Sequence, residues 1–211
     1  MTLNTQAKQT ILCGICGGIG SGKSFIAARF QALGAVVFDA DQAGHQVLLQ
    51  PRVKSELVQK WGDDILQSDG ELDRSAIAAL VFAPTAQGTR DRQFLQSISH
   101  PLIELELKQL IQQTSAEIVI LDAALLFETG WNRYCDRVIY VEADESLRQR
   151  RCEERGWSIT DFKLRESSQL DLLEKRKQAD FVIENQGDDD QTAGQVAMTW
   201  QTLSLMVREK V

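Results

Sequence analysis

A glycine-rich segment at residues 17–24 is the first place where residue types and spacing predict chemistry. It reads GGIGSGKS and fits the pattern G-x-x-x-x-G-K-[ST]. Glycines let backbone N–H groups converge on phosphate oxygens, because no Cβ atom stands in the way. We expect Lys23 to reach the β- and γ-phosphates of a nucleoside triphosphate, and the Ser24 hydroxyl to ligate Mg²⁺. The nucleotide-binding residues predicted here are Gly18, Ile19, Gly20, Ser21, Gly22, Lys23, Ser24 and Phe25.

Two carboxylates, Asp39 and Asp41, end the next apolar run of the sequence. If the backbone stays extended, an offset of two residues puts both side chains on one face. The carboxyl end of a strand in an open α/β sheet is where ligands bind. One carboxylate would then accept a proton from a substrate hydroxyl, and the other would hold a magnesium-bound water. Alternatively, one of them caps the helix that follows.

Three arginines, Arg148, Arg151 and Arg155, have offsets of three and seven residues and would share one face of a helix. Three cations on one face, followed by Gly156, suggest a phosphate clamp on a mobile lid. Such a clamp neutralises the charge that develops during phosphoryl transfer. The alternative is a solvated helix held by ion pairs between charges four residues apart.

Histidine and aspartate side chains give further candidates for substrate contact. His100 precedes Pro101, which biases its backbone away from helix and predicts a junction residue. Its side chain would contact substrate in a cleft or cap the helix that starts at the proline. His45 lies four residues after Asp41 and would face the same cleft. Asp122 ends the third apolar run, where it would contact substrate or act as a second-shell magnesium ligand.

Five short apolar runs separated by helical patterns must position these residues. Runs that are apolar throughout predict buried parallel strands covered by helices on both faces. The fold class expected is therefore α/β, a five-stranded parallel sheet of the P-loop NTPase type. The expected strands are 11–16, 35–39, 118–121, 137–141 and 181–183. The expected helices are 24–33, 51–61, 74–82, 90–99, 101–114, 145–155, 161–178 and 189 to the end.

Composition narrows the classes of function. The chain has 211 residues, of which 43% are hydrophobic and 25% charged, so we expect one α/β domain with a full core. A net charge of −7 argues against sequence-independent binding to nucleic acid. The polar start of the chain lacks the apolar region of a secretory signal, and no apolar run is long enough to span a bilayer. We expect a cytoplasmic protein without a membrane or nucleic-acid partner.

The four cysteines include one C-x-x-C pair, Cys13 and Cys16. The pair suggests either a redox site or two small apolar residues in a buried strand. We favour the buried strand, because free cysteine is mostly buried and an offset of three puts the side chains on opposite faces. With two histidines and no second cysteine pair nearby, we expect no structural zinc site.

Motifs in a fixed order identify a family that the chain resembles. GGIGSGKS, LGAVVFDADQAGHQ, DGELDR, HPLI, LDAALLFE and QADFVIENQG follow one another from about residue 11 to residue 187. This combination resembles the dephospho-CoA kinase family, whose fold is similar to that of the nucleoside monophosphate kinases. The resemblance implies transfer of the γ-phosphate of ATP to the 3′-hydroxyl of the ribose of dephospho-CoA, which completes coenzyme A.

Roles come from this resemblance position by position. Asp41 matches the family's proposed catalytic base, and His100 lies in its small CoA-facing domain. Arg151 and Arg155 match lid arginines, and Asn185 and Gly187 match the segment beside the adenine. The residue patterns described above supply the other assignments. Lys23 joins the catalytic residues, Ser24 and Asp39 form the metal site, and the substrate site comprises Asp39, His45, His100 and Asp122. The parts expected are a core at about 10–50, 116–142 and 179–211, a helical CoA-facing part at 51–115 and a lid at 145–178.

Departures from the family pattern and rival functions remain open. Phe25 stands where the family has a hydroxyl residue, and Ala123-Ala124 replaces a more typical apolar–proline pair. These departures concern substrate contacts. The rivals are a P-loop kinase for another nucleoside, nucleotide or small hydroxyl acceptor, and a nucleotide-dependent switch without turnover. We expect a monomer, with an oligomer left open.

Overall fold

The computed structural model describes residues 10–209 of the chain. The polar start on which the secretory-signal argument partly rests, residues 1–9, lies outside the described residues. The chain divides into two compact units, Met1–Asp39 with Gln113–Val211, and Ala40–Gln112. We call them the sheet unit and the helical unit.

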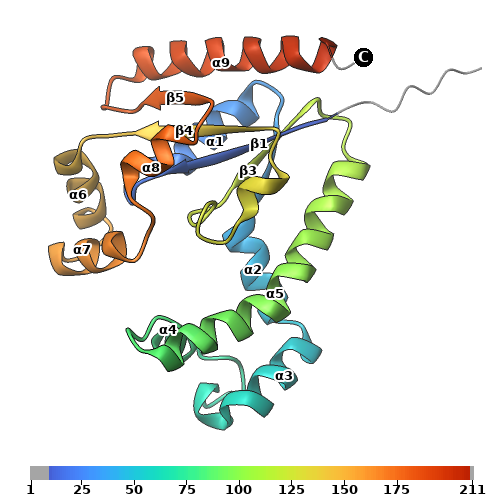
Figure 1. Cartoon of the computed structure of the whole chain (residues 1–211), viewed down its shortest axis with the longest axis vertical. Helices are drawn as coiled ribbons and strands as arrows, with labels where there is room; N and C mark the ends of the chain where they lie inside the picture. Colours follow the sequence, from blue (N-terminus) through green and yellow to red (C-terminus); the bar gives the residue numbers. More distant parts are fainter. Residues whose placement is uncertain (1–9, 210–211) are drawn as a thin grey trace, which may run out of the picture. The chain divides into compact units, whose positions relative to one another are not determined.

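A five-stranded parallel sheet forms the centre of the sheet unit (Figure 1). Its strands lie in the order β2-β3-β1-β4-β5, and each neighbouring pair is parallel. The bounds are β1 Ile11–Gly17, β2 Val36–Asp39, β3 Ile118–Asp122, β4 Arg137–Glu142 and β5 Phe181–Glu184. All residues of β1 and β3 are buried, as expected for central strands covered on both faces. The predicted α/β fold is confirmed.

Helices cover both faces of this sheet. Helices α1 (Lys23–Ala32) and α9 (Asp189–Glu209) pack on one face, where Phe30 and Leu203 join the buried side chains of Ile15 and its neighbours. Helix α8 (Leu172–Lys177) contacts β1 from the other face. Continuous apolar strands leave no polar face, so each side of the sheet needs its own helices.

The chain between β4 and β5 forms three short helices. They are α6 (Glu145–Glu153), α7 (Ile159–Ser167) and α8. The single helix predicted at 161–178 is wrong, because Asp171 caps a new helix by accepting from the backbone N–H groups of Leu173 and Glu174. A capping box between Ser158 and Asp161 begins α7. A 3₁₀ turn, η2 (Trp131–Tyr134), lies earlier, between β3 and β4.

The helical unit contains α2 (Ala40–Leu48), α3 (Pro51–Trp61), η1 (Asp63–Ile65), α4 (Arg74–Val81) and all but the last residue of α5 (Ala86–Gln113). The helix break predicted before Pro101 is wrong, since α5 continues through it. An interior proline costs roughly 3 kcal/mol in a helix. The buried side chains of Ser99, Ile103 and Leu107 supply packing that offsets this cost. His100 is therefore a mid-helix residue and not a junction.

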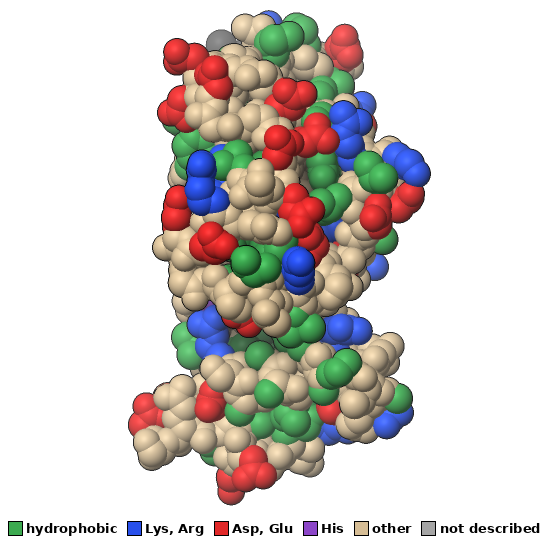
Figure 2. All heavy atoms as spheres, turned by 90° about the vertical axis from the view of Figure 1, so that its left-hand side faces the viewer, with side chains coloured by type: hydrophobic (Ala, Val, Ile, Leu, Met, Phe, Trp, Pro, Cys, Tyr) green, Lys and Arg blue, Asp and Glu red, His purple; other side chains and the backbone are tan. Residues whose placement is uncertain are grey.

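The charged side chains of one face can be compared directly. Figure 2 shows acidic and basic side chains interspersed on the visible face of the molecule, without a broad basic area there. Within residues 10–209, no helix has both the length and the apolar character needed to cross a bilayer.

Candidate active site

The glycine-rich loop lies between β1 and α1, the strand–loop–helix setting that a phosphate-binding loop requires. Gly20 and Gly22 have φ angles of 74° and 93°, in the left-handed region that favours glycine. A Cβ atom on Gly20 would overlap the carbonyl oxygen of Arg148, and one on Gly22 would overlap the amide nitrogen of Asn185. Both conformation and packing therefore require glycine here.

Lys23 and Ser24 occupy the first turn of α1. The Lys23 Nζ atom donates to the carbonyl oxygens of Gly17 at 3.3 Å and Gly18 at 3.1 Å. The ammonium is thus held against its own loop, next to the start of the helix, where the dipole favours anions. The Ser24 side chain is exposed. The hydroxyl of Ser21 is buried and lacks a hydrogen-bond partner among the described residues.

Arg148 is buried behind the loop, with 4% of its surface exposed. Its Nε donates to the carbonyl oxygen of Ala143 and its Nη1 to that of Ile19, both at 3.2 Å. Nη1 also pairs with the carboxylate of Glu166 on α7, and the guanidinium lies 5.3 Å from the centre of the Phe162 ring. Arg148 therefore braces the loop from behind and is not the outward-facing cation that the clamp interpretation requires.

Arg151 joins the loop to the segment after β5. Its Nη1 donates to the carbonyl oxygens of Gly20 at 3.3 Å and Ser21 at 3.2 Å. Its Nη2 donates to the backbone oxygen of Asn185 at 3.1 Å, and the Asn185 Nδ2 donates back to the Ser21 oxygen at 2.8 Å. Burial, and to a lesser extent the neighbouring arginines, lower the pKa of Arg151. These bonds fix the loop against a segment more than 160 residues away in the sequence.

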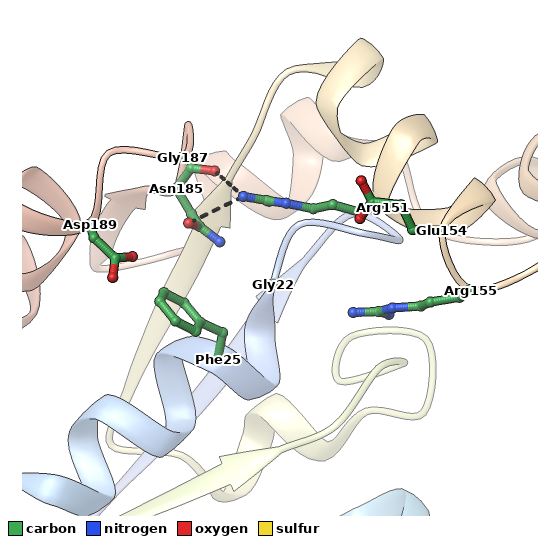
Figure 3. Close-up of a pocket in the computed structure, with 8 residues that line it drawn as sticks. All are labelled: Gly22, Phe25, Arg151, Glu154, Arg155, Asn185, Gly187 and Asp189. Atoms are coloured by element: carbon green, nitrogen blue, oxygen red, sulfur yellow. Dashed lines mark hydrogen bonds between the residues drawn. The ribbon is translucent and has the colours of Figure 1, made fainter.

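Arg155 lies beyond α6, which ends at Glu153. The turn after the helix includes Gly156, whose φ of 82° stops the helix from continuing. The prediction that Arg148, Arg151 and Arg155 share one helical face is therefore wrong for Arg155. Its side chain nevertheless extends into the same pocket as Arg151 (Figure 3).

A pocket of about 340 Å³ opens beside the loop (Figure 3). It is lined by Gly22, Phe25, Arg151, Glu154, Arg155, Asn185, Gly187 and Asp189. Six of these were assigned to the site from the sequence, and the structure brings them together. Glu154 and Asp189 were not, because Glu154 lies four residues after Arg150, the spacing of a helical ion pair, and Asp189 begins α9, where a carboxylate suits the helix dipole. Their sequence signals point to those local roles alone.

Acidic side chains lie side by side at the carboxyl edge of the sheet. Asp39 ends β2 and is paired in register with Asp122, which ends β3 and is also paired with Ile15 of β1. Asp39 is exposed and Asp122 is buried. The backbone does not stay extended from Asp39 to Asp41, because α2 begins at Ala40 and puts Asp41 in its first turn, so the condition for the two side chains to share one face is not met.

The helical unit carries the remaining candidates. Asp41 and His45 are four residues apart on α2, so they share one helical face. Both side chains are exposed, and the imidazole of His45 is hydrogen-bonded to Arg74 at the start of α4. His100 is partly buried within α5. The structure thus divides the predicted site residues between a sheet unit that holds the loop and a helical unit that holds Asp41, His45 and His100.

The cysteines lie outside this pocket. Cys13, Cys16 and Cys152 are buried, Cys135 is partly buried, and all four are free thiols. Burial raises the pKa of Cys16 to about 12 and that of Cys135 to about 12, and it raises those of Cys13 and Cys152. Such thiols are predominantly protonated and packed in the core, which supports the buried-strand interpretation of the C-x-x-C pair.

Comparisons with known proteins agree with this geometry. The family model for dephospho-CoA kinase (CoaE) matches residues 11–191. A dephospho-CoA kinase of Methylococcus capsulatus is 37% identical over 187 residues, which are 87% of this chain and 90% of that protein. One from Symbiobacterium thermophilum is 35% identical over 195 residues, covering 90% of this chain and 80% of that protein.

Solved structures give the same result for the fold. The crystal structure of TT1252 from Thermus thermophilus has a TM-score of 0.83 and 31% identity, and the match covers 92% of this chain and 98% of that one. A dephospho-CoA kinase from Campylobacter jejuni, at 24% identity, shares the fold with a TM-score of 0.65 over 92% of this chain and 96% of its own. Because the family model spans most of the sequence and the relatives align over nearly all of it, the chain belongs to the dephospho-CoA kinase family.

Proposed function

We propose that the chain carries out its family's reaction with the residues gathered around the loop and on α2. In this reaction the γ-phosphoryl group of ATP is transferred to the 3′-hydroxyl of the ribose of dephospho-CoA, giving coenzyme A and ADP. One observation carries the assignment of the ATP site. A pocket with two arginines opens at the start of α1, directly beside a loop that is held by partly buried hydrogen bonds from Arg148 and Arg151.

The loop and its arginines bind the triphosphate and stabilise the transferring group. Lys23 and the backbone N–H groups of residues 18–24 hold the phosphates. Arg148 and Arg151 keep this loop in one conformation, so that little reorganisation is needed when charge develops. Arg155, which extends into the pocket, neutralises part of that charge. We infer that residues 145–178 act as the lid, anchored at Arg148 and Arg151.

A magnesium ion fits the oxygen donors at the edge of the sheet. The exposed hydroxyl of Ser24 on α1, and the carboxylates of Asp39 and Asp122 on neighbouring strands, are the hard ligands that Mg²⁺ prefers, directly or through water. When bound, the ion neutralises charge on the β- and γ-phosphates. Ser24 and Asp39 are the proposed ligands, and Asp122 would contact the ion through a bound water.

Asp41 is the proposed general base. It is exposed, lies two residues after the end of β2, and stands at the first turn of a helix. An ionised carboxylate accepts the proton of the attacking hydroxyl as the phosphoryl group transfers. We assign the acceptor to the helical unit, where His45, Arg74 and His100 supply polar contacts for dephospho-CoA.

The direct experiment is an acceptor panel. Purified protein is incubated with Mg-ATP and dephospho-CoA, a nucleoside or a nucleoside monophosphate, and ADP and phosphorylated acceptor are measured. We expect ADP and phosphorylated acceptor with dephospho-CoA, and neither with the nucleoside or the nucleoside monophosphate. Turnover with another acceptor instead identifies the rival kinase, and ATP binding without acceptor-dependent ADP identifies a switch.

Asp41→Asn tests the proposed base. Because the variant keeps the size of the side chain but not its charge, kcat should fall at least about a hundredfold with little change in the KM for ATP. An unchanged kcat removes Asp41 from the mechanism. Magnesium dependence, cytoplasmic location and a monomeric state stay predictions, for which metal titration, fractionation and light scattering are the measurements.

A further inference from the structure

Phe25 places an exposed aromatic ring in a pocket whose other lining residues are mostly polar. Of its surface, 43% is exposed, and it sits on the first turn of a helix that buries Ile26, Ala27 and Phe30 in the core. Figure 3 shows the ring on the α1 side of the pocket, with Asn185 and Gly187 across from it and Arg151 and Arg155 extending in from α6 and the turn after it. Leaving a large ring in water is unfavourable, and covering it with an apolar or aromatic group recovers that free energy.

The ring is held in place by a cation from the next turn of α1. The guanidinium carbon of Arg29 lies 4.5 Å from the centre of the Phe25 ring. The Nη2 atom of Arg29 also forms an ion pair of 3.0 Å with Asp189, at the start of α9. A guanidinium bound in this way supports the ring through a cation–π contact. The ring is thereby positioned while much of its surface stays open to the pocket.

The polar groups nearby are already engaged with the protein. The side-chain amide of Asn185 donates to the Ser21 oxygen and accepts from Arg151, and Asp189 pairs with Arg29. Phe25 is the one aromatic side chain among the eight lining residues. In the proposed ATP site the phosphates lie at the loop beside Gly22, which leaves the part of the pocket lined by Phe25, Asn185 and Gly187 for the base.

We propose that the Phe25 ring is the platform on which the base of ATP stacks, and that Arg29 and Asp189 position this ring. The inference rests on the proposed ATP site and names a residue that sets nucleotide affinity and base preference. Stacking of a base on an aromatic side chain depends on the area of the base, so purines gain more than pyrimidines. The chain therefore uses Phe25 to favour purine triphosphates.

The test compares three substitutions at this position. Phe25→Leu keeps an apolar side chain without a π face, Phe25→Ser has a small hydroxyl side chain, and Phe25→Tyr keeps the aromatic ring. Stacking on an aromatic ring contributes on the order of a five- to hundredfold change in affinity. We expect the KM for ATP to rise by about tenfold or more in the Leu and Ser variants and to stay near wild type in the Tyr variant. At saturating ATP, kcat should stay within about twofold.

A ligand without a nucleobase distinguishes the loss of stacking from a distortion of the loop, since both would weaken ATP binding. Inorganic tripolyphosphate binds the loop but has nothing to stack, so its inhibition constant should be the same in all four proteins. The preference for ATP over CTP should fall in the Leu variant. Phe82→Leu, which changes a ring that is 57% exposed in the helical unit, is the matched control and should leave the KM for ATP unchanged.

Three results overturn the inference: an unchanged KM for ATP in the Leu and Ser variants, a parallel loss of tripolyphosphate binding, or an unchanged ATP-to-CTP preference. Thermal unfolding of each variant verifies that it is folded. If wild-type protein shows no turnover with dephospho-CoA, the proposed function fails separately. Calorimetric binding of ATP and CTP then still tests the platform in the same variants.

Discussion

The two ends of the proposed nucleotide pocket differ in how closely the protein packs around them. We call the end at Gly20 and Gly22 the phosphate end, and the end at Gly187 and Asp189 the base end. At the phosphate end, a Cβ atom on Gly20 or Gly22 would overlap a neighbour, and Arg148 is almost completely buried. At the base end, a Cβ atom on Gly187 would meet nothing within 4 Å, and the Asp189 side chain is 76% exposed. Both ends belong to the sheet unit, and both line or adjoin one pocket.

This difference indicates which part of the site must hold its ligand groups most precisely. Transfer of a charged group gains most from donors that are already in place, and close packing prevents them from moving. Binding of a base needs surface area and tolerates small displacements. Changes at the phosphate end should therefore act on the chemical step, and changes at the base end on the affinity for ATP. The predictions that follow test this comparison.

The largest effect is expected from Gly20→Ala. The methyl group meets the carbonyl oxygen of Arg148, and the backbone φ of 74° is unfavourable for alanine. A displacement of the loop by about 1 Å costs on the order of a hundredfold in kcat/KM. Steady-state kinetics with ATP and dephospho-CoA measure this loss in kcat/KM.

Gly187→Ala is the matched change at the base end. Its φ of 100° also disfavours alanine, but the added methyl group meets no neighbour. We expect only a few-fold loss, on the order of 1 kcal/mol, mainly in the KM for ATP. Equal losses in the two variants contradict the difference between the ends.

Arg148→Gln is expected to reduce turnover less than Gly20→Ala does. The variant removes the donor to the Ile19 oxygen and leaves the Glu166 carboxylate without its buried partner. Because one buried partner is lost, the free energy of unfolding should fall by about 3 kcal/mol. We also expect roughly tenfold lower kcat, because the loop is less well held.

Two further variants show whether Arg148 acts through the loop. Arg148→Gln combined with Glu166→Gln removes the unpaired charge, so it should recover stability but not kcat. Arg137→Gln breaks an exposed pair with Asp180, 3.8 Å long and at the opposite edge of the sheet, and should change neither quantity noticeably. Recovery of kcat in the double variant assigns Arg148 a purely structural role.

The smallest effect on turnover is expected from thiol reagents. With its pKa raised to about 12, the thiol of Cys16 carries far less thiolate at pH 8 than an ordinary cysteine, and it is buried next to the loop. Iodoacetamide at pH 8 should therefore leave kcat unchanged and alkylate the protein rapidly only after urea is added. Rapid loss of activity in the native state would show that the phosphate end opens readily.

The same shift predicts a dependence of stability on pH. The pKa of Cys16 is raised in the folded state, so its neutral thiol contributes stability that is fully present below the unfolded pKa of 9.0. This contribution is lost as the pH rises toward about 12. The midpoint of thermal unfolding should fall over that range, and Cys16→Ala should reduce the slope.

Local contacts explain which parts of the molecule the sequence predicts well. The strands, α1 and the phosphate loop depend on residues that are close together in the chain, and their apolar periodicity and glycine spacing are visible directly. Predictions based on a single local signal were weaker. Pro101 does not break α5, and Asp171 splits the helix expected at 161–178.

The sequence by itself determined the phosphate loop, the parallel sheet and, through the order of its motifs, the family. Only the tertiary structure decided what the arginines of α6 do. The partner of Arg148 lies 18 residues away on another helix, and Arg151 reaches Asn185, 34 residues away. No spacing rule within one element encodes such contacts, because they depend on how α6, α7 and β5 pack around the loop. In the folded chain, Arg148 and Arg151, two of the three arginines predicted to clamp phosphate, donate to carbonyl oxygens of the loop and support it. Phe25 stays exposed beside the loop.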